Sequence, residues 1–242
     1  MTPRAARPRV VSLVPSATET LSAWGVEPVA VTRFCERPDL PSVGGTKDPD
    51  IDAVVAAAPD LVVLCREENR REDADALAAA GLALEVLDID ALDDVAVELS
   101  RLARRLGLEP ADLPLGAVEA PPAADAAGPG RVAFVPVWRR PWITISGACY
   151  AASLLRRLGI DPVVTAAGGR YPRIEPERLV GRVDLVLAPS EPYPFSERHH
   201  EELSSIAPVT FVDGQDLFWW GVRTPAALAR LRAQLTPPQP SV

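Results

Sequence analysis

The stretch RVVSLVPSATETLSAWG, from Arg9 to Gly25, decides how the rest of the chain is interpreted. Its first half is a short β-branched run that ends at Pro15, which is typical of a buried strand followed by a turn. In its second half, Ser16 or Thr18 is a candidate N-cap and Gly25 a stop signal, which predicts a helix. A strand that leads directly into a helix is the first unit of a parallel α/β fold.

The same order of elements recurs in the second half of the chain. RVAFVP, which begins at Arg131, is similar to RVVSLVP, and LRRLGIDPVV is similar to LSAWGVEPVA. RVDLVLAPSE is similar to APDLVVLCRE, so that Asp184 matches Asp60. Three matched blocks in one order indicate a repeat. The predicted fold class is α/β, with two Rossmann-like lobes built on parallel sheets and a ligand cleft between them.

A change of composition separates the two predicted lobes. The run LDDVAVELSRLARRLG has the apolar spacing of an amphipathic helix, and residues 107–130 that follow are rich in Pro, Ala and Gly. We expect an N-terminal lobe over residues 1–91, a connecting helix and Pro/Ala-rich linker over residues 92–130, and a C-terminal lobe over residues 131–242.

Charge and composition exclude several classes of function. The net charge of −8 over 242 residues makes the chain a poor partner for nucleic acid. No apolar segment is long enough to span a bilayer, so we expect no membrane insertion. We also expect a monomer. The apolar run before Pro15 is too short for a signal peptide, which predicts a cytoplasmic protein. A mis-assigned start would instead allow a periplasmic or cell-surface location.

Loops at the carboxyl ends of parallel strands are where such folds bind ligands. Ser16 is either a simple cap or an anion contact, and Glu67 and Glu68 are either a solvated helix start or polar ligand contacts. The aromatic and acidic residues of the later loops are either packing or ligand walls: Trp138, Glu191, Trp219 and Trp220. Arg139 and Arg140 are interpreted as partners of Glu67, Glu68 or an acidic ligand group.

The reactive residue types form no recognisable catalytic pattern. Cys35, Cys65 and Cys149 make no C-x-x-C pair, and free buried thiols are the simplest interpretation. The adjacent His199 and His200 would point apart on a helix, which disfavours a metal site. No nucleophile–base motif, P-loop or zinc motif is present, so we expect no enzyme, no catalytic residues and no intrinsic cofactor.

RVVSLVPSATETLSAWG, followed by PDLVV, resembles the helical-backbone metal receptor superfamily, with the class III periplasmic-binding-protein fold. This family includes the vitamin B12-binding, iron-siderophore-binding and heme-binding proteins of bacterial ABC importers. The resemblance covers Arg9 to about Leu235. It implies two lobes joined by a helix, with the ligand in the cleft between them.

The resemblance also implies roles for individual residues. The family's ligand positions fall on Pro15, Phe34, Trp142, Tyr171 and Asp216. Two further family aromatics fall on Cys65 and Thr46, where this chain has lost the aromatic ring. The two acidic residues that dock on a permease, one in each lobe, correspond to Asp52 and Glu177, although an acid is also favourable at any helix start.

The leading hypothesis is therefore a non-enzymatic solute-binding protein that holds a corrinoid or another metal chelate, with cobalamin, heme and ferric siderophore as candidate ligands. An ABC permease is the expected partner if the chain is exported. Two alternatives stay open. One is a cytosolic thiol- or metal-handling protein in which the three cysteines converge. The other is a ligand-free regulatory or interaction module whose cleft is filled by Trp219 and Trp220.

Overall fold

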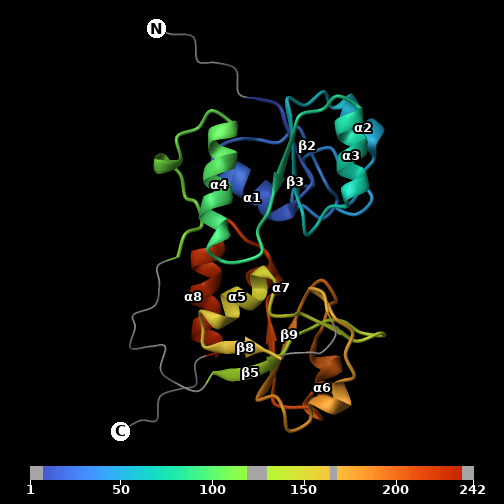
Figure 1. Ribbon diagram of the computed structural model, residues 1–242, viewed down its shortest axis with the longest axis vertical. Coiled ribbons are helices and arrows are strands. Elements are labelled where there is room, and N and C mark those ends of the chain that lie inside the picture. Colours follow the sequence, from blue (N-terminus) through green and yellow to red (C-terminus); the bar gives the residue numbers. More distant parts are fainter. Residues whose placement is uncertain (1–7, 119–129, 164–167, 236–242) are drawn as a thin grey trace. The chain divides into compact units, whose positions relative to one another are not determined.

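The computed structural model describes residues 8–118, 130–163 and 168–235, which form two compact units (Figure 1). Unit 1 comprises Met1–Ile89, Asp93–Ala117 and Trp220–Arg223, and unit 2 comprises Asp90–Leu92, Val118–Trp219 and Thr224–Val242. Each unit contains a four-stranded parallel sheet. The predicted α/β class with two parallel-sheet lobes is confirmed, whereas the predicted domain boundaries and the cleft stay predictions.

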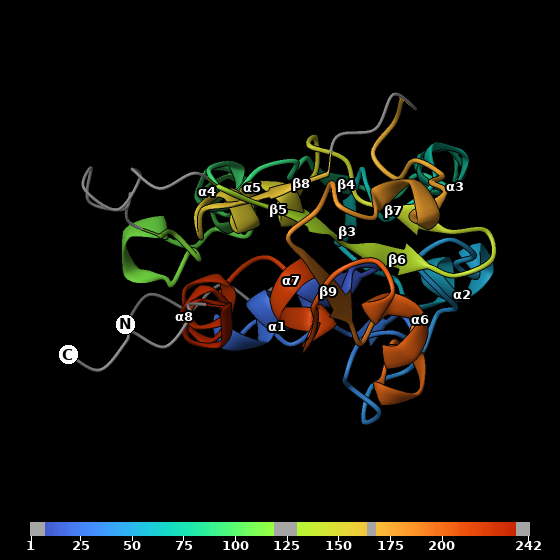
Figure 2. The ribbon, with the colours of Figure 1, turned by 90° about the horizontal axis from the view of Figure 1, so that it is seen from below.

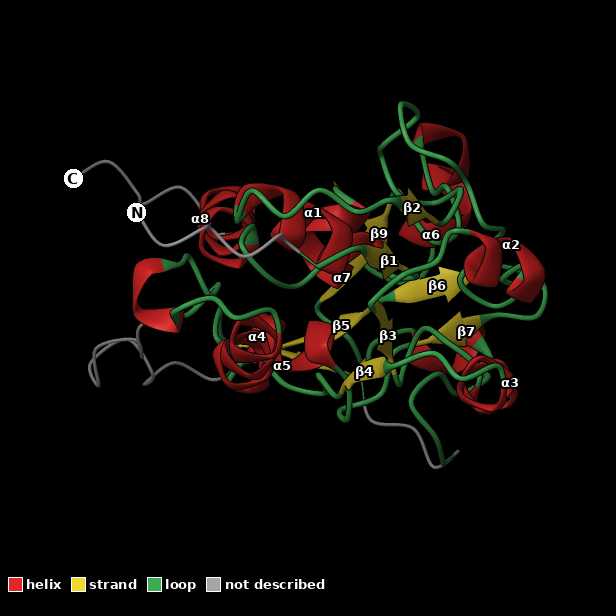
Figure 3. Ribbon diagram, turned by 90° about the horizontal axis from the view of Figure 1, so that it is seen from above, coloured by secondary structure: helices red, strands yellow, loops and turns green. Residues whose placement is uncertain are grey.

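The sheet of unit 1 has the strand order β2-β1-β3-β4. Its strands are β1 (Val10–Ser12), β2 (Ala30–Val31), β3 (Leu61–Cys65) and β4 (Leu84–Leu87). Helices α1 (Pro15–Ala23) and α4 (Asp94–Arg105) lie on one side of the sheet, and α2 (Ile51–Ala56) and α3 (Arg71–Ala79) on the other (Figures 1 and 3). All five residues of β3 are buried, as expected for a continuous apolar strand that is covered on both faces.

Helix α1 begins differently from the sequence prediction. Its N-cap is Val14, with Pro15 as the first helical residue, so the prediction of Ser16 or Thr18 as N-cap is wrong. Proline is favoured at this position because its fixed φ suits a helix and its missing N–H would have no intrahelical partner. The helix therefore starts before the hydroxyl residues. Thr18 Oγ1 instead lies 3.0 Å from the carbonyl oxygen of Val14 and 2.8 Å from Ser12 Oγ.

The first part of the predicted linker is attached to unit 1. A 3₁₀ helix, η1 (Pro110–Asp112), follows α4, and the indole Nε1 of Trp24 donates to the carbonyl oxygen of Pro114 at 2.9 Å. Gly116 has φ +68°, and a Cβ atom there would lie 2.1 Å from the carbonyl oxygen of Gly221. The remainder of the predicted linker, residues 119–129, lies outside the described residues.

The sheet of unit 2 has the strand order β10-β9-β5-β8. Its strands are β5 (Arg131–Phe134), β8 (Ile160–Pro162), β9 (Leu185–Pro189) and β10 (Val209–Val212). Helices α5 (Tyr150–Arg156), α7 (Gly214–Phe218) and α8 (Thr224–Leu235) lie on one side of it and α6 (His200–Ser204) on the other (Figure 2). The described residues of unit 2 also include the 3₁₀ helices η3 (Pro176–Leu179) and η4 (Glu197–His199).

The sequence repeat corresponds to a repeat of backbone geometry. The carboxylate of Asp60 accepts a hydrogen bond from the backbone N–H of Arg9, and that of Asp184 accepts one from the backbone N–H of Val132. Gly25 and Gly159, which follow the helices α1 and α5, have φ angles of +68° and +71°. This left-handed conformation ends a helix with little strain only at glycine or asparagine.

The two units differ after their first strands. Only Leu13 and Val14 separate β1 from α1, whereas residues 135–149 separate β5 from α5. That longer segment forms an antiparallel hairpin of β6 (Pro136–Trp138) and β7 (Ile143–Thr144), on the same side of the sheet as α6 (Figures 2 and 3). Relative to unit 1, this stretch of unit 2 is therefore an insertion that carries its own strands.

Among the described ranges, no helix combines the length and the apolar character needed to cross a membrane.

Candidate functional site

The predicted ligand residues of unit 1 lie in loops that follow β2 and β3. Phe34 is 52% exposed, and the guanidinium carbon of Arg33 lies 4.8 Å from the centre of its ring. This is the geometry of a cation–π contact on one face of the ring. Phe34 is therefore an aromatic side chain that the unit leaves open to solvent at the end of a strand.

Cys65 and the two glutamates after it have different environments. Cys65 is buried, and burial, reinforced by the charge of Glu68, raises the pKa of its thiol to about 12. Glu67 and Glu68 are half-buried in the turn after β3, and the backbone oxygen of Glu67 accepts a hydrogen bond from Lys47 Nζ at 2.8 Å. The thiol is therefore protonated and shielded from solvent at neutral pH.

Asn69 is a positioning residue that the sequence analysis did not identify. Its side chain is buried, and its Oδ1 accepts a hydrogen bond from the backbone N–H of Cys65 at 2.8 Å. Its Nδ2 donates to the carbonyl oxygens of Leu13 and Thr46, at 3.2 and 2.9 Å. Asn69 thus connects the loop after β3 to the loops that carry Pro15 and Thr46. A lone amide residue directly after a run of charged residues gives little sequence signal for such a role.

Pro15 and Ser16 are both buried in the first turn of α1. The Oγ atom of Ser16 is buried and has no hydrogen-bond partner among the described residues. Burying a hydroxyl without a partner is unfavourable, so this atom is a candidate for contact with a group that the structure does not contain.

In unit 2, the hairpin and the segment beside it bring three predicted aromatic residues onto one substructure. Trp138 is 44% exposed and Tyr171 is 40% exposed. The backbone N–H of Thr144 donates to the carbonyl oxygen of Pro172 at 3.0 Å, and that of Ile174 donates to the carbonyl oxygen of Trp142 at 3.1 Å. The segment that carries Tyr171 is thereby paired with the hairpin.

Trp142 has a different environment from Trp138. Its ring is stacked on that of Phe195, with centroids 6.0 Å apart and an interplanar angle of 8°, and lies 6.1 Å from the ring of Phe134. The half-buried Trp142 therefore packs against the hydrophobic core of unit 2. Trp138 instead meets Tyr193 edge-on at 5.6 Å.

Three further predicted residues belong to the end of unit 2. Trp219 Nε1 donates to Glu191 Oε1 at 2.7 Å, so these two side chains are in direct contact. Asp216 is buried, and its carboxylate accepts two hydrogen bonds from the guanidinium of Arg230, at 2.7 and 2.5 Å. Asp216 is therefore the buried member of an ion pair whose other member, Arg230, is exposed. Trp220 belongs to unit 1 and is also buried.

Arg139 has a partner other than the predicted glutamates, whereas the predicted role of Arg140 stays a prediction. Arg139 forms a two-point ion pair with Glu202 of its own unit, with distances of 2.8 and 3.2 Å, which corrects the expected pairing with Glu67 or Glu68. Arg140 is exposed and has φ +65° at the turn of the hairpin.

The two predicted docking residues are exposed acids at helix starts. Asp52 lies in the first turn of α2, next to the N-cap Asp50, and Glu177 lies in the first turn of η3. Their exposure is compatible with contact to a partner, and the docking role stays a prediction.

The cysteines do not form a recognisable metal site. All three thiols are buried and free, Cys35 and Cys65 in unit 1 and Cys149 in unit 2. Within the described parts of the chain, no three His, Cys, Asp or Glu side chains are grouped so that they could hold a metal ion. The thiol- and metal-handling alternative therefore gains no support from the geometry.

The chain is similar in sequence and in structure to proteins that are already known. No protein-family model matches the chain. It is 32% identical over 108 residues to a vitamin B12-binding protein of Yersinia pestis, which covers 42% of this chain and 39% of that protein. Its structure matches the periplasmic vitamin B12-binding protein of Vibrio cholerae with a TM-score of 0.75 and 20% identity, over 95% of this chain and 96% of that one. It also matches a periplasmic heme-binding protein from Pseudomonas aeruginosa with a TM-score of 0.76 and 21% identity, over 94% and 92% of the two chains.

The chain has the class III periplasmic-binding-protein fold. The resemblance predicted from the sequence is confirmed for the fold. The sequence match to the curated relatives spans less than half of their length.

The prediction of a cytoplasmic protein is wrong, because the solved structures that share this fold are periplasmic proteins. That prediction used only the length of one apolar run near the first residue.

Proposed function

We propose that this chain is a non-enzymatic solute-binding protein that holds a bulky, flat metal chelate of the corrinoid, heme or ferric-siderophore class. The observation that carries the proposal is the set of aromatic side chains left open to solvent beside the sheets of a B12-binder fold. Phe34, Trp138 and Tyr171 are between 40% and 52% exposed. Large aromatic rings are normally buried, and exposed ones are enriched at binding surfaces.

The chemistry of these side chains suits such a ligand. A macrocycle or a siderophore presents wide apolar faces, and flat rings bury these faces with little loss of conformational freedom. The unpartnered hydroxyl of Ser16 and the half-buried Glu67 and Glu68 are proposed as polar contacts in unit 1. In unit 2, Glu191 and Trp219 are proposed to act as a pair, because they are already hydrogen-bonded.

The remaining predicted site residues have weaker roles in this proposal. Trp142, Asp216, Trp220 and Cys65 have half-buried or buried side chains engaged with their own unit, so we propose that they support the site rather than cover the ligand faces. Pro15 shapes the start of α1. The cleft between lobes, predicted from the sequence, remains the proposed location of the ligand.

Transport is the proposed context of binding. The named relatives include periplasmic B12- and heme-binding proteins, which supports a location outside the cytoplasm for this chain. An ABC permease is the proposed partner, with the exposed Asp52 and Glu177 as docking residues. An exposed acid in each unit is suited to pairing with basic residues on a partner.

Titration with cyanocobalamin, hemin and a ferric hydroxamate siderophore tests the proposal, with tryptophan fluorescence and calorimetry as readouts. At least one of them is expected to bind with a micromolar or lower Kd. Trp138→Ala and Tyr171→Ala are expected to weaken binding about tenfold each, which corresponds to ~1.4 kcal/mol for the loss of one ring contact. Val180→Ala, at another exposed apolar residue of unit 2, is the matched control and is expected to have no effect. Absence of binding by all three ligands at tens of micromolar would overturn the proposal.

A further inference from the structure

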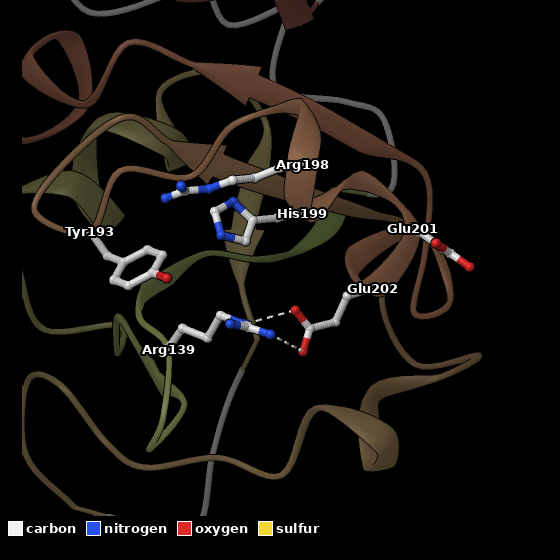
Figure 4. A pocket seen from close by; sticks show the side chains of 6 residues that line it. All are labelled: Arg139, Tyr193, Arg198, His199, Glu201 and Glu202. Atoms are coloured by element: carbon white, nitrogen blue, oxygen red, sulfur yellow. Dashed lines mark hydrogen bonds and ion pairs between the residues drawn. The ribbon is translucent and has the colours of Figure 1, made fainter.

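A cavity of about 720 Å³ lies within unit 2, beside the predicted ligand residue Trp138. Arg139, from the hairpin turn, lines one side of it. The other lining residues come from the segment after β9 and from α6: Tyr193, Arg198, His199, Glu201 and Glu202. Figure 4 shows the ring of His199 between the side chains of Arg198 and Arg139. The cavity therefore gathers two arginines and a histidine in a chain whose net charge is −8.

His199 is held in one orientation and one tautomer. It is only 6% exposed, and its Nδ1 accepts a hydrogen bond from the backbone N–H of Ser196 at 3.1 Å. Because Nδ1 is an acceptor, a neutral ring must carry its proton on Nε2. Burial, reinforced by the positive charges of Arg198 and Arg139, lowers the pKa of His199. The Nε2–H donor has no acceptor among the described residues.

The two carboxylates at the cavity are not both engaged with its guanidinium groups. Both oxygens of Glu202 are engaged by Arg139. Figure 4 shows the side chain of Glu201 directed away from the other five. Arg198 has no carboxylate partner in the part of the chain that the structure describes. Glu202, with a smaller contribution from Tyr193, raises the pKa of Arg139. Donors in the cavity therefore exceed acceptors, and one guanidinium remains without an ion-pair partner.

We propose that this cavity binds an oxyanion, the carboxylate or phosphate group of a small organic molecule, between Arg198, the Nε2–H of His199 and the hydroxyl of Tyr193. A guanidinium presents paired N–H donors that match the two oxygens of such a group. The aromatic edge formed by Trp138 and Tyr193 adjoins the cavity and supplies apolar contact for the organic part of the ligand. The inference does not depend on the chelate that the protein binds.

Nuclear magnetic resonance of the histidine side chains tests this proposal in the full-length chain. The chain has only two histidines, so a His200→Gln variant assigns the signals of His199 directly. Titrations use inorganic phosphate, benzoate, and chloride at matched ionic strength. Phosphate or benzoate is expected to shift the His199 signals with saturation in the millimolar range and to leave His200 unchanged. A bound anion is also expected to raise the pKa of His199, because it stabilises the imidazolium form against Arg198 and Arg139, the two cations that face the ring alongside Glu202.

Matched arginine variants separate a site from general ionic effects. Arg198→Gln is expected to weaken anion binding about tenfold or more, because it removes a charged two-point contact. Arg182→Gln removes an exposed arginine elsewhere in unit 2 and is expected to leave binding unchanged. Tyr193→Phe is expected to cause a smaller loss than Arg198→Gln. Saturation by benzoate alone assigns a carboxylate ligand, and saturation by phosphate alone assigns a phosphate. Shifts that do not saturate, that chloride reproduces, or that are the same in the Arg198 variant would overturn the proposal.

Discussion

The carboxylate of Asp60 accepts a hydrogen bond from the backbone N–H of Arg9 at 2.8 Å. In unit 2, Asp184 makes the same bond to Val132 at 2.6 Å. Asp60 directly precedes β3, and Asp184 directly precedes β9. Each aspartate thus joins the start of that buried strand to the start of the first strand in its unit. The contact fixes the register of two neighbouring parallel strands, because it satisfies a backbone donor that lies at the edge of the strand ladder.

Asp60→Ala and Asp184→Ala are each expected to lower the free energy of unfolding by about 1 kcal/mol, because each leaves a strand-end N–H without its acceptor. Urea denaturation measures the change. Asp75→Ala is the control, since Asp75 is exposed and forms only an open i,i+4 ion pair with Arg71. Equal stability of all three variants would contradict the assignment of a register-fixing role.

Gly116→Ala is expected to destabilise unit 1 by about 3 kcal/mol, because the new Cβ would meet the carbonyl oxygen of Gly221 at 2.1 Å in a left-handed backbone conformation. Gly107→Ala is a matched control. Gly107 has a similar φ of +70°, but a Cβ atom there has nothing within 4 Å. It is expected to cost only about 1 kcal/mol, from backbone strain alone. Thermal or urea unfolding measures the stability of both variants. Similar losses of stability in Gly116→Ala and Gly107→Ala would rule out the steric contact.

Alkaline pH is expected to destabilise the protein through Cys65. Its pKa is raised by burial from 9.0 to about 12 in the folded state. The unfolded state therefore loses its thiol proton first, so the stability contributed by this group is complete below pH about 9 and is lost as pH rises towards about 12. Urea midpoints measured across this range should fall less steeply in Cys65→Val than in the unmodified chain. If the urea midpoint fell equally steeply with pH in Cys65→Val and in the unmodified chain, Cys65 would be excluded as the cause.

Arg230→Ala is expected to lower the free energy of unfolding by about 2 kcal/mol, because it removes the two-point partner of the buried Asp216 carboxylate. Arg232→Ala, at an exposed arginine of the same helix, is the control and should change stability by less than about 0.5 kcal/mol. Chemical denaturation provides both values. A purely ligand-contacting role for Asp216 would instead leave the stability of Arg230→Ala unchanged.

Residue patterns predicted most of the secondary structure because parallel α/β units have strong local signals. The apolar run before Pro15 predicted a buried strand, and β1 (Val10–Ser12) lies within it with all three residues buried, since a strand covered on both faces has no polar alternation. Asp50 caps α2 by accepting a hydrogen bond from the backbone N–H of Ala53. The hairpin β6–β7 was missed because its strands have two or three residues and a basic turn, which give no clear period.

The candidate site was less accessible to sequence reasoning. Loop positions identified Trp138 and Trp142 together, but only packing distinguishes them. Trp142 stacks on Phe195 in the core of unit 2, whereas Trp138 remains open. Arg139 was assigned a partner in the wrong unit, because the sequence does not show which acid a long, flexible arginine side chain will reach.

The sequence by itself determined the two-unit α/β architecture, because the repeated strand, glycine and aspartate signals act over a few residues each. Only the tertiary structure decided the pairing of Arg139 with Glu202, the hydrogen bonds by which Asn69 connects three loops, and the cavity around His199. These contacts join residues that are distant in the chain, or whose direction depends on a turn. Their free energies arise from distances and burial that form only when the chain has folded.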